Sequence, residues 1–226
     1  MTPENYPRRG DSIFPATNKF TTRIPDLEGE WVAYADSYKQ AADILAAQTS
    51  ASDQLLEPTI FLYRHLLELR LKSIIALGFV AEEDGNAREK LKELVRKHDL
   101  RWLVSGCRAL CESHGIFGSG IRVKDMFAAS EKCIGEVADI DPGSYSFRYP
   151  IDRKLQASIR RPFNLSADHV RQIVGKLDNL LKLLQQQMEA KVDGFEGIDD
   201  TDAENERCRK EYFGIDEMEA DQESEE

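Results

Sequence analysis

Residues 58–78 read PTIFLYRHLLELRLKSIIALG, and this stretch decides the fold. On a helix of about 3.6 residues per turn, four of its titratable side chains fall within one arc of about 100°. This charged stripe consists of Arg64, His65, Glu68 and Lys72. Apart from Arg70 and Ser73, the other positions from Ile60 to Leu77 are apolar or small. The stretch therefore predicts a central helix that is buried over most of its circumference and has one narrow side open to a cleft or an interface.

Helical periodicity extends to both sides of this central helix. We expect the central helix to begin at a cap at Asp53 and to stop at Gly78. We expect the other helices from Asp26 to about Ala47 and over residues 87–97, 99–113, 122–138 and 168–190. The sequence thus predicts an all-α helical bundle of about five or six helices.

A different pattern comes before the last long helix. Asp141-Pro142-Gly143 is a turn signal, and residues 144–150, SYSFRYP, alternate polar and aromatic side chains. The alternation predicts a short strand or extended loop with Tyr145, Phe147 and Tyr149 on one side. Basic residues continue to residue 161, and basic side chains beside exposed rings suit single-stranded RNA. Alternatively, the rings pack this aromatic and basic insertion onto the bundle and the charges are solvated.

The charge is distributed unevenly along the chain. Residues 193–226 carry 15 Asp or Glu and 3 Lys or Arg, a net charge of −12, whereas the whole chain of 226 residues carries −11. The first 192 residues are therefore nearly neutral at +1, so the acidic overall balance does not exclude a nucleic-acid partner. We expect an extended arm over residues 1–25, a helical domain over residues 26–192 and a disordered acidic tail over residues 193–226.

Several classes of protein lack support in the sequence. No stretch reaches the roughly 18–20 apolar residues of a membrane span, and the first residues lack the apolar core of a secretory signal. We therefore expect a cytoplasmic protein with no membrane partner. No phosphate-binding loop, metalloprotease motif or calcium loop occurs, and we expect no cofactor. The spacing of Cys107, Cys111, His114 and Cys133 is not that of a zinc finger or ribbon, so we expect buried thiols and no metal.

The charged stripe allows a structural and a functional interpretation. Arg64 and Glu68, like Glu68 and Lys72, are four residues apart and can pair along a helix for about 0.2–0.5 kcal/mol per pair. In the functional interpretation, His65 transfers protons near neutral pH, Arg64 binds a phosphate and Glu68 fixes the histidine tautomer. The sequence leaves both interpretations open.

Three strings carry a family resemblance. They are PTIFLYRHLLELRLKSII over residues 58–75, KHDLRWL over residues 97–103 and DPGSYSFRYPID over residues 141–152. They resemble one branch of the HEPN proteins (higher eukaryotes and prokaryotes nucleotide-binding domains), over roughly residues 27–190. HEPN proteins are all-helical and often dimeric. Many are metal-independent ribonucleases of toxin–antitoxin, anti-phage and CRISPR systems, whereas others have lost catalysis and bind partners.

The resemblance implies an RNA-directed protein, with metal-independent endoribonuclease activity in a bacterial toxin or anti-phage defence system as the leading expectation. It also implies a homodimer whose cleft joins two copies of the charged stripe. In that mechanism a histidine exchanges a proton at the ribose, and an arginine stabilises charge on the phosphate. The candidate catalytic residues are Arg64, His65 and Glu68, and the candidate substrate-binding residues are Lys72, His98, Arg148, Tyr149 and Arg153. The alternative is a non-catalytic helical module that binds a protein or a nucleotide.

The catalytic motif of the family is an arginine followed, after four to six residues, by a histidine. In this chain only Arg108 and His114 fit it, and they lie on a mid-chain helix. The pair is either a true motif or a chance match, and both alternatives stay open.

Overall fold

The computed structural model describes residues 30–49, 53–82, 86–117, 121–152, 154–159 and 165–192. These residues form α-helices and one 3₁₀ turn, η2, and contain no strand. The elements are α1 (Glu30–Thr49), η2 (Asp53–Leu55), α2 (Leu56–Ala81), α3 (Ala87–Val95), α4 (Leu100–Ser113), α5 (Ile121–Ile140) and α6 (Ala167–Val192). The predicted all-α bundle of five or six helices is confirmed for these residues.

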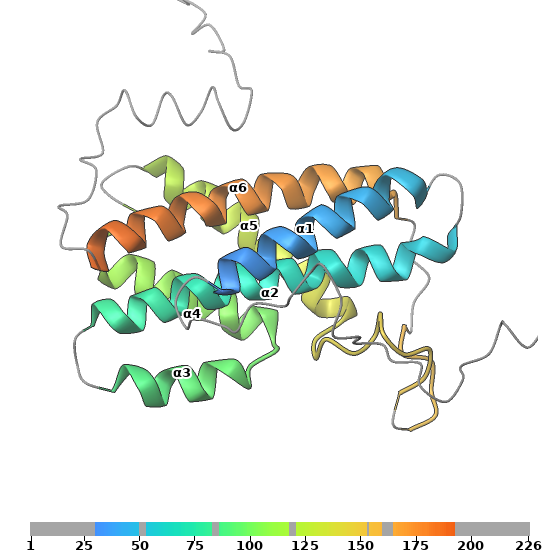
Figure 1. Ribbon diagram of the computed structural model, residues 1–226, viewed down its shortest axis with the longest axis horizontal. Helices are drawn as coiled ribbons and strands as arrows, with labels where there is room; N and C mark the ends of the chain where they lie inside the picture. Colours follow the sequence, from blue (N-terminus) through green and yellow to red (C-terminus); the bar gives the residue numbers. More distant parts are fainter. Residues whose placement is uncertain are drawn as a thin grey trace, which may run out of the picture.

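Helix α2 is the centre of the bundle, as its apolar sequence predicts. It packs against α1, α3, α4 and α6, while α5 packs against α4 and α6. Figure 1 shows α1, α2 and α6 running along the long axis of the molecule. Leu66, Leu67, Leu71 and Ile74 of α2 are completely buried, and each such burial contributes about 1.5–3 kcal/mol. Because α2 is surrounded, the charged side chains near its middle also lie close to the core.

Two predicted limits of α2 are wrong. Asp53–Leu55 form a 3₁₀ turn, and the N-cap of α2 is Leu55, which makes no side-chain capping hydrogen bond. Helix α2 also continues through Gly78 to Ala81. A Cβ atom at Gly78 would lie 3.0–3.2 Å from side-chain carbons of Leu110 in α4. The glycine therefore permits a close approach of two helices instead of ending one.

Gly78→Ala is expected to lower the free energy of unfolding by about 1–3 kcal/mol, because the added methyl group crowds Leu110. Gly175→Ala in α6 is the matched control. No atom lies within 4 Å of the Cβ position at Gly175, so this exchange should stabilise the helix by about 0.5–1 kcal/mol. Urea unfolding followed by circular dichroism measures both variants. A Gly78→Ala protein as stable as the wild type would contradict the close approach of α2 and α4.

The insertion before α6 is not a strand. Residues 141–152 and 154–159 form turns, with one isolated bridge between Ile151 and Ala157. The amides of Arg148 and Tyr149 donate to the Tyr145 carbonyl at 3.1 and 3.3 Å, which makes this segment a helical turn with a period close to four. Phe147 is consequently buried while Tyr149 is 47% exposed, so the predicted alternation with period two is wrong.

Some predicted features cannot be placed in this fold. The N-terminal arm over residues 1–25, the expected helix start at Asp26, Arg153 and the acidic tail over residues 193–226 all lie outside the described residues. The division of the chain into an arm, a domain and a tail therefore stays a prediction. None of the described helices combines the length and the apolar character needed to cross a lipid bilayer.

Candidate functional site

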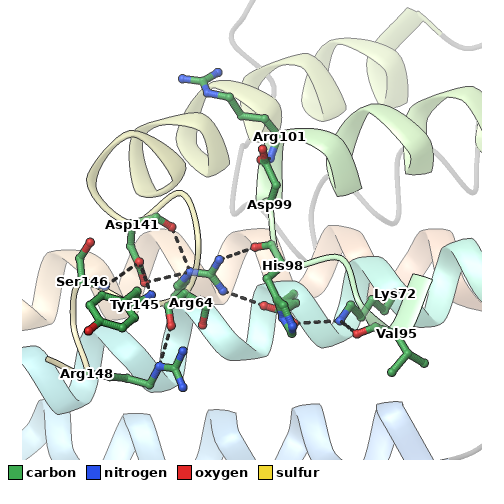
Figure 2. Close-up of polar contacts among 12 residues, drawn as sticks. Arg64, Lys72, Val95, His98, Asp99, Arg101, Asp141, Tyr145, Ser146 and Arg148 are labelled. Atoms are coloured by element: carbon green, nitrogen blue, oxygen red, sulfur yellow. Dashed lines mark hydrogen bonds and ion pairs between the residues drawn. The ribbon is translucent and has the colours of Figure 1, made fainter. Parts of the chain in front are cut away.

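Three members of the charged stripe are buried. Arg64 and Glu68 are each 1% exposed, and Lys72 is 4% exposed. Figure 2 shows that the connection between α3 and α4 and the segment after α5 lie over them. The predicted opening to a cleft is therefore absent above these three side chains, which are covered by the same chain.

Arg64 binds both covering segments to α2. Its Nη1 donates to Glu68 Oε2 at 2.7 Å, and its Nη2 donates to the backbone carbonyl of His98 at 2.5 Å. Its Nε lies 3.1 Å from Asp141 Oδ2 and donates to the Asp141 carbonyl at 3.3 Å. Each guanidinium nitrogen thus has a partner inside the protein, and one arginine joins three segments of the chain.

Asp141 extends this network into the insertion. Its Oδ1 accepts hydrogen bonds from the amides of Tyr145 and Ser146 at 2.6 and 2.8 Å. The Ser144 carbonyl in turn accepts a hydrogen bond from Arg148 Nε at 2.6 Å (Figure 2). The position of Arg148 is therefore linked to α2 through a short series of hydrogen bonds.

Glu68 holds one ring nitrogen of His98. Glu68 Oε1 lies 2.8 Å from His98 Nδ1 and accepts a hydrogen bond from Lys72 Nζ at 2.9 Å. Lys72 also donates to the Val95 carbonyl at 3.1 Å, next to the α3–α4 connection. Burial raises the pKa of the Glu68 carboxyl, but hydrogen bonds from Lys72, Arg64 and His98 bring that pKa below its ordinary value. The carboxylate is therefore ionised at pH 7, and Nδ1 of His98 carries the proton that is donated to it.

The ring of His98 is half in the network and half in solvent. The His98 side chain is 53% exposed, whereas its partner Glu68 is 1% exposed. Because Nδ1 donates to Glu68, the other ring nitrogen, Nε2, lies on the far side from the carboxylate. A buried carboxylate that orients an exposed imidazole in this way is suited to general acid–base chemistry.

His65 lies on the same helix in a different environment. Its ring makes an edge contact with Tyr38 of α1, with 4.4 Å between centroids, and stacks on Phe61 with 6.0 Å between centroids. Burial lowers the pKa of His65 below its ordinary value, while the nearby Glu68 carboxylate acts in the opposite direction. The His65 imidazole is therefore neutral at pH 7 and belongs to an aromatic contact instead of the ionic network.

Arg148 and Tyr149 lie at the exposed edge of the site. The guanidinium carbon of Arg148 is 5.7 Å from the centroid of Phe61 and 5.6 Å from that of Tyr149. Tyr149 stacks on Tyr145 with 4.5 Å between centroids. Within the part of the chain that the structure describes, Nη1 and Nη2 of Arg148 have no hydrogen-bond partner. Arg148 is exposed, and two of its nitrogens therefore have no partner among the described residues.

Arg108 and His114 have separate environments. Two guanidinium nitrogens of Arg108 donate to the carboxylate of Glu131, and the group lies over the ring of Phe127 at 5.2 Å. His114 directly follows α4, and its Nε2 is buried without a hydrogen-bond partner among the described residues. These surroundings favour the interpretation of this pair as a chance match to the motif.

The cysteines of α4 are buried, as the sequence predicts. Cys107 and Cys111 lie one turn apart in the core. A hydrogen bond from Cys111, together with burial, raises the pKa of the Cys107 thiol well above its ordinary value, so that it stays protonated. Over the described ranges, no group of three or more His, Cys, Asp or Glu side chains is arranged to hold a metal ion.

Sequence reasoning missed two members of the site. Asp141 reads only as part of a turn signal, although it is a buried partner of Arg64. Phe61 lies at the edge of the charged arc and reads as a core residue, although it contacts both His65 and Arg148. No protein-family model, curated protein or solved structure matches the chain.

Proposed function

We propose that the protein is an RNA-directed, HEPN-like protein that cleaves RNA without a metal ion, with His98 as the group that transfers the proton. The observation that carries this proposal is the 2.8 Å contact between Nδ1 of His98, which is 53% exposed, and the buried carboxylate of Glu68. Because Nδ1 is held by Glu68, Nε2 lies on the far side of a half-exposed ring in a fixed orientation, where we expect a substrate to reach it.

In the proposed reaction the ribose 2′-hydroxyl is the nucleophile. Nε2 of His98 takes its proton while the 2′-oxygen attacks the adjacent phosphorus. The bond from phosphorus to the 5′-oxygen breaks, and that oxygen takes a proton from water, which leaves a 2′,3′-cyclic phosphate and a 5′-hydroxyl. The ionised Glu68 stabilises the imidazolium through the Nδ1–H hydrogen bond. Nη1 and Nη2 of Arg148, which have no partner among the described residues, stabilise charge on the phosphate.

This proposal changes several of the roles that the sequence suggested. Arg64 and Lys72 are buried and bind within the protein, so they position the α3–α4 connection that carries His98. His65 contacts aromatic rings and takes no part in the proton transfer. Glu68 acts through His98 and is a positioning residue.

The test is a cleavage assay with end-labelled single-stranded RNA in the presence of EDTA near neutral pH. We expect the wild-type protein to produce 2′,3′-cyclic phosphate ends. The same RNA with 2′-deoxyribose at the cleaved position should stay intact, because the nucleophile is missing. A His98→Ala protein purified in parallel serves as the blank for contaminating nucleases. A folded wild-type protein that leaves the RNA intact would overturn the catalytic proposal.

A non-catalytic binding module is the second candidate. It is favoured by the pairing of Arg64, Glu68 and Lys72 with groups of the same chain, since a purely structural ionic core needs this arrangement as well. This candidate predicts no RNA cleavage and no effect of His98→Ala on partner binding. The bacterial toxin or anti-phage setting and the homodimer belong to the first proposal. Analytical ultracentrifugation tests the homodimer.

A further inference from the structure

One side of α1 is exposed and carries no charged residue. Between residues 33 and 48 the exposed, uncharged positions recur at helical spacing, within an arc of about 140°. We call this set the α1 face; its members are Ala33, Tyr34, Ser37, Gln40, Ala41, Ile44, Ala47 and Gln48. Tyr34 and Ile44 are large side chains that are 47% and 55% exposed. The solvent side of a helix usually carries charged residues, so an uncharged face of this length indicates a contact with another surface.

The charged residues of the same part of α1 are engaged within the chain. Asp36 lies beside the α1 face and binds Arg70 of α2 and Lys182 of α6, the latter at 3.0 Å. Lys39 donates to Asp43 at 2.6 Å. Asp36, Lys39 and Asp43 are all the charged residues between 33 and 48. A partner on the α1 face would therefore leave the ion pairs of this segment intact.

The α1 face is complementary in shape to a second copy of itself. In an antiparallel pair of helices related by a two-fold axis, each residue faces the residue that lies equally far beyond the axis. An axis between residues 40 and 41 pairs Ala33 with Gln48, Tyr34 with Ala47, Ser37 with Ile44 and Gln40 with Ala41. Each of these pairs joins a large side chain to a small one, so the two helices can approach closely and their side chains can interdigitate.

The polar groups on and beside the α1 face fit this arrangement as well. The Ser37 hydroxyl donates to the Ala33 carbonyl of its own helix at 2.9 Å, so it keeps this partner when it is buried. The axis also brings Lys39 of one copy to within one residue, about 1.5 Å along the helix, of the level of Asp43 in the other copy. Asp36 at the same edge keeps its own cations. Opposite charges from the two copies therefore favour this register.

We propose that two copies of the chain associate through the α1 face, with their α1 helices antiparallel. The face contains no residue of the candidate site. This dimer therefore differs from the one that the family resemblance implies, in which two charged stripes share a cleft, and it does not require RNA cleavage. One helix face is a small interface, so we expect a weak association with a dissociation constant of about 1–100 µM.

The first measurement is sedimentation velocity of the full-length chain over a concentration series from about 1 to 300 µM, which brackets that dissociation constant. The wild-type protein should change from monomer to dimer over the series. Ile44→Asp should weaken association at least about 30-fold, because two carboxylates enter the apolar contact. Val95→Asp is the matched control, since Val95 is also 55% exposed but lies on α3. It should associate as the wild type does, and circular dichroism checks that both variants fold.

The second measurement tests the antiparallel register by linking introduced cysteines with a short bismaleimide. The background protein carries Cys133→Ser and Cys208→Ser, so its remaining native thiols are buried. Ala41→Cys should link to itself in the other copy, because residue 41 lies at the axis. Tyr34→Cys should link to Ala47→Cys when the two proteins are mixed. It should not link to itself, since the two copies of residue 34 are about 20 Å apart along the helix.

Three results would overturn the inference. They are a wild-type protein that stays monomeric at the highest concentration, an association that Ile44→Asp and Val95→Asp affect equally, and linkage of Tyr34→Cys to itself in place of Ala47→Cys. RNA cleavage by a wild-type protein that stays monomeric would contradict the α1 contact alone. Association that is lost only in Ile44→Asp, without any RNA cleavage by the wild type, would contradict the catalytic proposal and leave the α1 contact in place.

Discussion

A His98→Ala variant is expected to cleave RNA about 10²–10⁴-fold more slowly than the wild-type protein, because it lacks the imidazole that Glu68 orients. Glu68 keeps Arg64 and Lys72 as partners, and the His98 side chain is 53% exposed, so the variant should remain folded. Single-turnover cleavage rates in EDTA measure the effect, and circular dichroism checks the fold.

Three further variants show whether a loss of cleavage in His98→Ala is caused by the missing proton transfer. His169→Ala is the matched control, because His169 is exposed in the first turn of α6 and has no contact with Glu68. It should cleave at the wild-type rate. His98→Asn keeps an N–H that can donate to Glu68 but cannot transfer a proton, so it should be as slow as His98→Ala. Cleavage lost only in His65→Ala would restore the assignment made from the sequence.

Arg64→Met is expected to lower the free energy of unfolding by about 3–5 kcal/mol, the usual cost of removing one partner from a buried ionic network. The change leaves the carboxylates of Glu68 and Asp141 buried with fewer donors. It also leaves the His98 carbonyl without its donor. Urea unfolding monitored by circular dichroism measures the difference between the variant and the wild type.

Arg171→Met provides the control for the same chemical change at the surface. Arg171 pairs with Asp168 at 3.2 Å, and both side chains are largely exposed, so the loss should be below about 1 kcal/mol. If Arg64→Met and Arg171→Met were equally stable, the network around Arg64 would not hold the covering segments. If Arg64→Met stays folded, its cleavage should also fall, because His98 loses part of its support.

Burial of an arginine on α2 does not by itself indicate a site. Arg70 is completely buried as well, and it donates to Asp178 of α6 at 2.7 Å and to Asp36 of α1. These partners join three helices and belong to the scaffold. Arg64 differs because its partners His98 and Asp141 belong to segments that also carry exposed side chains, so its network connects the core to the surface.

The sequence by itself determined the bundle and the chemistry available to it. Hydrophobic periodicity is a local property, so it placed α2 at the centre, and helical spacing brought Arg64, Glu68 and Lys72 onto one face, where they do pair. The buried thiols of Cys107 and Cys111 followed from the same local reasoning. The sequence misled at two places for different reasons. At Gly78 a close contact with Leu110 of α4 replaced the local rule, and over residues 144–150 a local turn closed by hydrogen bonds to the Tyr145 carbonyl formed instead of extended chain.

Only the tertiary structure decided which histidine Glu68 orients and which side chains of the site are exposed. The sequence made His65 the candidate catalytic histidine because it falls within the same arc of the helix as Arg64 and Glu68. Arg64 and His65 nevertheless lie about 100° apart, at opposite edges of that arc, and have different surroundings. His98 comes from the α3–α4 connection, 30 residues from Glu68, and Asp141 lies 77 residues from Arg64. Such contacts depend on how the α3–α4 connection and the insertion after α5 pack against α2. The same packing covers Arg64, Glu68 and Lys72 and leaves His98, Arg148 and Tyr149 exposed.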